Sequence, residues 1–244
     1  MYKSLGIACA VVVLCGASVT AVAAPLPPTR VRGTISSVTS HAVVLKTYAG
    51  HHRSFAVNGK TTFVSVVPGH LDQVKSGEFV GIAATGAKSS LKGLEVVIFP
   101  KSMRGAGEGH YPWSMPARVA AADQHQNSGM PAGAPPVQGT MTNGTVTNAA
   151  AGTVGPPVQG TMTNGTVKAD AQVAGGRKLA ITYNDGQHVN ITVPADAPVV
   201  HLVPASRSIA IVGAKTFVVA VKAGDGKFNA ALVAVGKEGL MPPM

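Results

Sequence analysis

The residues most able to do chemistry stand together near the middle of the chain, at Glu108, His110, Tyr111 and Trp113. Glu108 and His110 could bind a metal ion or act as an acid–base pair, because carboxylates and imidazoles serve in both roles. The same stretch holds the only tryptophan of the chain. Aromatic residues in a chain that has few of them usually bury area. We therefore favour a structural role, in which Tyr111 and Trp113 cap the first domain and Arg104 pairs with Glu108.

The remaining candidates for chemistry are scattered. His51 and His52 are adjacent, so on a strand their side chains would point to opposite faces and could not share one ion. The sequence has no H-E-x-x-H pair for zinc, no G-x-S-x-G nucleophile and no phosphate-binding glycine motif. We expect no catalytic residue and no cofactor, with a metal site at Glu108 and His110 as the alternative. The methionines that could add soft ligands for Cu(I) are irregularly spaced, at Met103, Met115, Met130, Met141 and Met162.

The N-terminus predicts export. Lys3 supplies a short positive region, residues 5–14 are apolar, and Ala21-Val22-Ala23 fits the small-x-small rule of signal peptidase. The apolar run is shorter than the about 20 residues that a membrane-spanning helix needs. We predict a signal peptide over residues 1–23, no membrane span after its removal, and a periplasmic or secreted mature chain.

Composition narrows the chemistry further. Both cysteines, Cys9 and Cys15, lie in the predicted signal peptide, so the mature chain has no thiol, disulfide or cysteine-based metal site. Without Lys3, 19 basic residues remain against 10 acidic ones, and no run of Lys or Arg occurs. A diffusely basic surface of this kind tends to associate with anionic polymers or lipid head groups.

A long internal repeat organises the mature chain. Val66-Val67-Pro68 matches Leu202-Val203-Pro204 at an offset of 136 residues, and the same offset pairs Gly77 with Gly213. A constant offset that matches apolar to apolar positions indicates a duplicated domain. We place the two copies at residues 30–100 and 161–240.

Each copy has the pattern of short strands, because runs rich in Val, Ile, Thr and Phe alternate with Gly, Asn and Ser. A short helical turn is expected at residues 70–75. The order of strands, a helical turn and two more strands predicts an all-β protein of two tandem five-stranded barrels of the OB type. A small antiparallel sandwich is the alternative. The expected strands are 31–38, 42–47, 53–57, 62–67, 79–85 and 94–99, then 178–183, 188–193, 199–203, 216–222 and 230–235.

The segment between the copies differs in kind. Residues 101–160 lose the apolar alternation and fill with Gly, Ala, Pro, Asn and Thr. A unit at residues 135–146 recurs at 156–167, an offset of 21. Because its Gly165-Thr166-Val167 resembles Gly33-Thr34-Ile35, the second unit is expected to form the first strand of the second copy. We predict a flexible linker at 101–160, largely disordered over 118–155.

Several stretches carry a family resemblance. They are Val31–Ile35, Gly77–Gly81, Leu94–Val96, Phe99-Pro100, Met103–Trp113, Met162–Val167 and the C-terminal Pro242-Pro243-Met244. Together they resemble a family of exported bacterial proteins with tandem domains of unknown function. Members are often labelled as permeases of metal ABC transporters, a label that the lack of spanning segments contradicts. The resemblance implies a fold and an envelope location and no established chemistry.

These features favour a non-enzymatic binding or structural module of the bacterial envelope. Its partner would be an envelope polymer, a small ligand or a protein. Nucleic acid is not expected, because the central strands offer few aromatic residues for base stacking. A periplasmic Cu or Zn accessory protein that uses Glu108, His110 and nearby methionines is the alternative, and a minor enzymatic role is the third hypothesis.

Overall fold

The structure is a computed structural model, and it describes residues 27–115 and 158–242. The predicted signal peptide, the stretch at 118–155 and the repeat unit at 135–146 lie outside these residues. Over the described ranges the chain is all-β, with its strands joined in one large mixed sheet. No helix in these ranges is both long and apolar enough to cross a membrane.

Strands of the two sequence copies correspond one to one. The first copy contributes β1 (Thr29–Val38), β2 (Ala42–Thr47), β3 (His52–Ala56), β4 (Thr62–Gly69), β5 (Phe79–Thr85) and β6 (Leu91–Ile98). The second copy contributes β8 (Val158–Val173), β9 (Gly176–Tyr183), β10 (Gln187–Pro194), β11 (Val199–Pro204), β12 (Lys215–Lys222) and β13 (Phe228–Gly236). Single 3-10 turns occupy matching places, at η1 (Leu71–Gln73) and η4 (Arg207–Ile209), and at η2 (Lys101–Met103) and η5 (Lys237–Gly239). β7 (Gly109–Met115) has no counterpart among the described residues.

The strands form because β-branched residues alternate with polar ones. In β10, Val189, Ile191 and Val193 are buried, whereas Asn190 and Thr192 between them are exposed. This period of two puts every apolar side chain on one face of the sheet. The alternation is therefore what directs β10 to cover a core.

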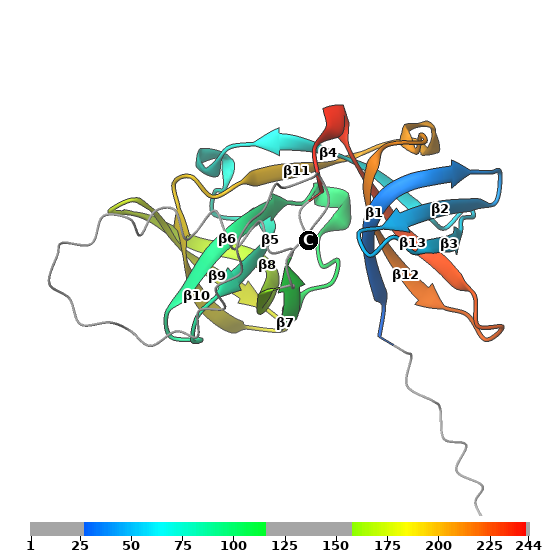
Figure 1. The fold of residues 1–244 in the computed structure, drawn as a ribbon. Coiled ribbons are helices and arrows are strands. Elements are labelled where there is room, and N and C mark those ends of the chain that lie inside the picture. Colours follow the sequence, from blue (N-terminus) through cyan, green and yellow to red (C-terminus); the bar gives the residue numbers. More distant parts are fainter. Residues whose placement is uncertain (1–26, 116–157, 243–244) are drawn as a thin grey trace, which may run out of the picture.

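Strand pairing closes two five-stranded rings, and each ring combines both sequence copies. The first ring runs β1–β2–β3–β13–β12 and back to β1, with β3 and β13 parallel. The second ring runs β8–β9–β10–β6–β5 and back to β8, with β10 and β6 parallel. Figure 1 shows the two rings as separate lobes, spanned by β4 and β11.

This exchange of strands corrects the expectation that residues 30–100 and 161–240 each close a barrel of their own. Three strands of one copy are completed by the last two strands of the other. Since the copies share one pattern, the last two strands of either copy offer similar apolar faces to a ring. The repeat in the sequence thus predicts the strands but does not distinguish their partners.

A twofold relation between the copies passes through the antiparallel pair β4–β11. Val66 and Leu202 occupy equivalent positions of the repeat, and they are directly paired across these strands. β4 also pairs in parallel with β13, and β11 pairs in parallel with β6. Each lobe is therefore connected through this central pair to the other.

Three apolar cores follow from this arrangement. Phe55 and Leu45 belong to the core inside the first ring, and Ile181 and Ile191 to the core inside the second. A third core lies where the rings meet. It contains Val64, Val66, Phe79, Ala83, Leu94, Val97, Phe99, Trp113, Met162, Val200, Leu202, Phe217 and Ala234. Burial of apolar area on this scale holds the two lobes together.

Candidate functional site

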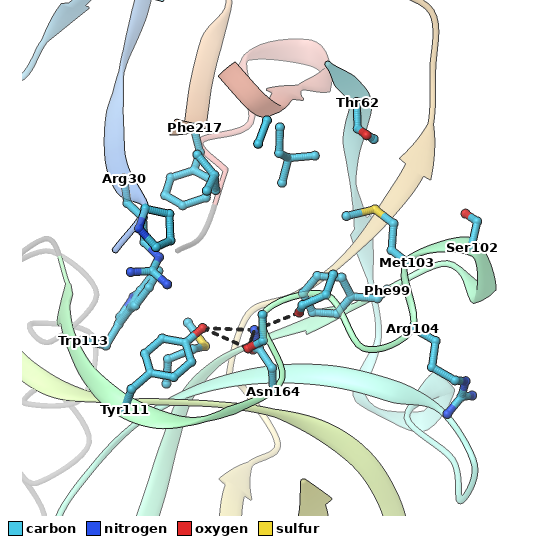
Figure 2. Close-up of a pocket in the computed structure, with 17 residues that line it drawn as sticks. Arg30, Thr62, Phe99, Ser102, Met103, Arg104, Tyr111, Trp113, Asn164 and Phe217 are labelled. Atoms are coloured by element: carbon cyan, nitrogen blue, oxygen red, sulfur yellow. Dashed lines mark hydrogen bonds between the residues drawn. The ribbon is translucent and has the colours of Figure 1, made fainter. Parts of the chain in front are cut away.

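A cavity of about 460 Å³ opens beside the third core, between the two rings. One wall comes from the first ring and β4, through Arg30, Thr62 and Phe217. The other comes from the second ring, through residues of β7, β8 and the η2 loop. Figure 2 shows Tyr111, Trp113 and Asn164 on this side of the cavity, with Arg30 lying against Trp113 and with Phe217 above them in the view.

β7 builds the aromatic wall. It pairs antiparallel with β8, so that Tyr111 lies opposite Met162 and Trp113 opposite Gly160. Alternation along the strand sends Tyr111 and Trp113 to the same face. Their rings meet edge to face with centroids 6.0 Å apart, and Trp113 lies 6.4 Å from Phe217 of β12. The single tryptophan thus packs between the two rings.

Two arginines of β1 lie over these rings. The Arg30 guanidinium is 4.9 Å from the Trp113 ring centroid and 5.1 Å from that of Tyr111. Arg32 lies 5.7 Å from Trp113 and 5.6 Å from Phe217, and it donates a hydrogen bond to the Ser114 carbonyl at 3.2 Å. A guanidinium stacked on aromatic faces is favourable electrostatically and is held in place.

Asn164 holds the loop at the floor of the cavity. Its Nδ2 donates to the Gly107 carbonyl at 3.0 Å and lies 3.2 Å from Tyr111 Oη. Gly105 and Gly107 have φ of +83° and +59°, which glycine adopts at little cost. The side chain of Asn164 fits because its neighbour on β5 is Gly81, where an added Cβ would lie 2.5 Å from Asn164 Oδ1.

Two buried polar atoms at the cavity have no hydrogen-bond partner among the described residues. They are Trp113 Nε1 and Asn164 Oδ1, on side chains that are 6% and 5% exposed. A buried donor or acceptor without a partner costs about 1–3 kcal/mol. Asn164 Oδ1 faces Gly81, whereas Trp113 belongs to the aromatic wall. The indole N–H is thus a buried donor without a partner in the wall of the cavity.

Burial also perturbs the hydroxyl of Tyr111. It raises the pKa of Tyr111 above its usual value, although the charge of Arg30 and a hydrogen bond from it oppose the shift. Tyr111 therefore stays protonated at neutral pH and can donate a hydrogen bond.

The other residues singled out in the sequence lie apart from the cavity or at its edge. Arg104 donates to the Gly77 carbonyl at 2.6 Å and to Thr166 Oγ1 at 3.1 Å, and Figure 2 shows its guanidinium turned away from the cavity. No ion pair joins it to Glu108 within the described residues. Arg104 thus ties the η2 loop to the second ring.

His110 points to the opposite face of β7 from the aromatic wall. Its Nδ1 lies 2.8 Å from Thr163 Oγ1, and its ring stacks on Tyr183 at 5.9 Å. Burial, and secondarily the positive Lys88, lower the pKa of His110. Glu108 is exposed. In the described part of the chain, no three His, Cys, Asp or Glu side chains group as a metal site would require.

The sequence pattern missed the residues that complete the cavity from the first ring. Arg30 and Phe217 are 187 positions apart in the chain, on strands that pair only through the exchange between copies. Asn164 belongs to the Met162–Val167 stretch of the family resemblance. The recurrence of this unit in the sequence could have indicated that Asn164 has a role. β7 lies within the predicted linker, yet it is a strand that pairs with that stretch.

Comparisons of this chain with protein-family models, with curated proteins and with solved structures found no match.

Proposed function

We propose that the protein is an exported, non-enzymatic binding module that holds a small ligand in the cavity between its two rings. The observation that carries this is the cavity itself, whose volume is in the range of small-molecule sites. Its aromatic walls, with a few polar groups placed among them, are typical of such sites.

The side chains around the cavity support binding by area, stacking and charge. Trp113, Tyr111, Phe217 and Phe99 supply apolar surface, and Arg30 supplies a positive charge. Such groups orient and retain a ligand without a proton transfer or a covalent step. We therefore assign the site to recognition, and among the expected partners we favour a small ligand over a polymer or a protein.

The fold supports an OB-type interpretation of each ring, assembled from both copies. Five strands close on themselves, and in each ring a 3-10 turn precedes one of the two exchanged strands, η4 before β12 and η1 before β5. OB-type barrels host many functions, so the fold alone does not choose the ligand. The predicted signal peptide over residues 1–23 supports a location in the periplasm or outside the cell.

The alternative from the sequence, a Cu or Zn accessory protein using Glu108 and His110, stays a prediction. Its test is calorimetric titration of the mature protein with each metal, compared with His110→Ala. Loss of stoichiometric binding in that variant would favour metal handling over small-ligand binding.

A block of the cavity tests the proposal directly. Ala231 is exposed, lies on β13 and lines the cavity, so Ala231→Phe should fill its opening while keeping the fold. Ala171→Phe is the matched control, because Ala171 is exposed on β8 outside the cavity.

Small apolar and amphipathic compounds would be screened against the mature chain by ligand-observed NMR. We expect compounds that bind to lose at least about tenfold in affinity with Ala231→Phe and to keep it with Ala171→Phe. Compounds that bind the Ala231→Phe variant as tightly as the parent chain would contradict the proposal. Chemical conversion of any bound compound by the protein would contradict it too.

A further inference from the structure

The charge at the cavity narrows the class of ligand. Arg30 and Arg104 are the only charged residues among those lining it, and no Asp or Glu of the described ranges joins them. The Arg104 guanidinium is engaged by the Gly77 carbonyl and Thr166. The Arg30 guanidinium lies over Trp113 and Tyr111 at the cavity wall. The positive charge of Arg30 is thus not matched by a carboxylate of the cavity.

We propose that the ligand is a small amphiphile with one anionic head, whose head group binds Arg30 and whose apolar body fills the space between Trp113, Phe217 and Phe99. This inference rests on the proposed function, because it names the chemical class that the same cavity takes. The occupant is a single-chain carboxylate rather than a peptide or a polymer. A cavity of about 460 Å³ suits a body of that size.

Stacking prepares Arg30 for an anion. A guanidinium offers five N–H donors in a planar fork that matches a carboxylate with two parallel hydrogen bonds. Because the fork already lies against two aromatic rings, less side-chain freedom is lost when an anion binds. The stack therefore favours a carboxylate over a neutral head of the same shape.

Trp113 supplies stacking area in the same wall. Its Nε1 is buried and has no hydrogen-bond partner among the described residues, so the indole N–H is not presented to a ligand in the cavity. An amide or hydroxyl head would leave the guanidinium charge of Arg30 uncompensated.

The apolar part of the cavity is formed jointly by both rings. Phe217 comes from β12 and Phe99 follows β6, so an apolar body would touch both lobes. Met162 and Leu232 line the same space. Water released from these surfaces favours an apolar chain over a bare anion. Inorganic phosphate should therefore bind far more weakly than an amphiphile.

Trp113 is the only tryptophan, so its emission reports on this cavity alone. The mature chain would be titrated at pH 7 with octanoate, with its neutral isostere octanamide, and with inorganic phosphate. We expect octanoate to shift Trp113 emission and to bind at least about tenfold more tightly than octanamide. Phosphate should produce no shift at the same concentrations.

Arg30→Gln should weaken octanoate binding to about the affinity of octanamide for the same variant, so that the preference for the anion is lost. Arg53→Gln is the matched control, because Arg53 also stacks on an aromatic ring, Phe228 at 5.8 Å, but lies outside the cavity. It should bind octanoate like the parent chain. Thermal denaturation would confirm that both variants are folded.

The outcomes separate this inference from the function on which it rests. Equal binding of octanoate and octanamide, abolished by Ala231→Phe, would overturn the anionic class and keep the cavity as a ligand site. Octanoate binding that survives Arg30→Gln would overturn the inference in the same way. Absence of any octanoate binding overturns it as well, whereas the proposed function fails only if the wider screen yields no binder that Ala231→Phe blocks.

Discussion

The two rings share one plan and differ at one strand. In the first ring, β1 pairs with β2 and β12. In the second, its counterpart β8 pairs with β9 and β5, and its N-terminal half also carries β7. The added strand brings Tyr111 and Trp113 against the arginines of β1. The symmetric part of the molecule thus supplies the scaffold, and the departure from symmetry supplies the candidate site.

A single pair of equivalent positions shows how the two halves of the cavity diverged. Phe217 on β12 corresponds to Gly81 on β5 at the repeat offset of 136. Phe217 projects a ring toward Trp113, whereas Gly81 leaves room for Asn164 and the ring of Phe99. The second copy thus has a large aromatic side chain at this position, and the first copy has none. The cavity needs both residues, because the ring of Phe217 forms one of its walls and Gly81 allows Asn164 to form another.

The largest effect should come from breaking the shared centre of the two rings. Leu202 is buried in the central strand pair β4–β11, where it lies opposite Val66. Leu202→Asp would therefore place an unpaired charge in the third core. We expect a loss of at least about 4 kcal/mol in the free energy of unfolding, in one transition that includes both rings. Denaturant unfolding followed by circular dichroism would measure this.

The adjacent position provides the control. Val203 is 43% exposed on the same strand, so Val203→Asp should change stability by less than about 1 kcal/mol. Two separate transitions for Leu202→Asp, one of them unchanged from the parent chain, would show that the rings do not depend on a common centre.

A smaller effect should follow from making the two copies more alike at the cavity. An added Cβ at Gly81 would lie 2.5 Å from Asn164 Oδ1 and 3.1 Å from the Phe99 ring. Gly81→Ala should therefore displace Asn164, loosen the loop that it holds and cost about 1–3 kcal/mol. Unfolding experiments and the emission of Trp113 would record both changes.

Gly59→Ala is the matched control, because nothing lies within 4 Å of an added Cβ there. It should leave Trp113 emission unchanged. If Gly81→Ala changed neither the stability nor the Trp113 emission more than Gly59→Ala does, the hydrogen bond between Asn164 and the Gly107 carbonyl would not matter for the cavity.

The sequence predicted the strands well because their pattern is local. Alternating residues such as Val189 and Ile191 mark a strand whichever partner covers it. The partner depends on which copy supplies the last two strands, and both copies carry equivalent faces. Arg30 and Phe217 come together only through that choice, so the cavity could not be assembled from spacing alone.

The distinctive stretch of the sequence predicted part of the site. The sequence predicts a packing role for Tyr111 and Trp113 and gives His110 a candidate role as a ligand or acid–base group. In the structure, strand alternation puts the two aromatic rings on one face of β7 and His110 on the other. Gly105 and Gly107 have positive φ in the loop before β7, and the proximity of that loop to Asn164 depends on the pairing of β7 with β8. In the sequence, β7 and β8 are separated by residues 116–157, and no local pattern there predicts that the two strands pair.

The smallest expected effect concerns the far face of β7. Because burial and Lys88 lower the pKa of His110, folding favours its neutral form. Its contribution to stability is then present above the unfolded pKa of about 6.5 and is lost as the pH falls toward the folded pKa. Solvent screening of the half-exposed ring limits this contribution to less than about 0.5 kcal/mol.

NMR titration of the His110 ring would test this shift. We expect a pKa below 6.5 in the parent chain and a rise with Lys88→Gln, since that change removes a positive charge. A pKa above 6.5, or a fall with Lys88→Gln, would contradict the burial and charge that the structure gives to this face of β7.

A cross-link tests the exchange of strands most directly. Thr34 of β1 and Lys215 of β12 are paired across the two sequence copies, and the two native cysteines, Cys9 and Cys15, both lie in the predicted signal peptide. In the double variant Thr34→Cys and Lys215→Cys, mild oxidation should form a disulfide that peptide mass spectrometry identifies. If instead Thr34→Cys with Phe79→Cys is the pair that cross-links in the folded protein, each copy closes its own ring and the exchange is wrong.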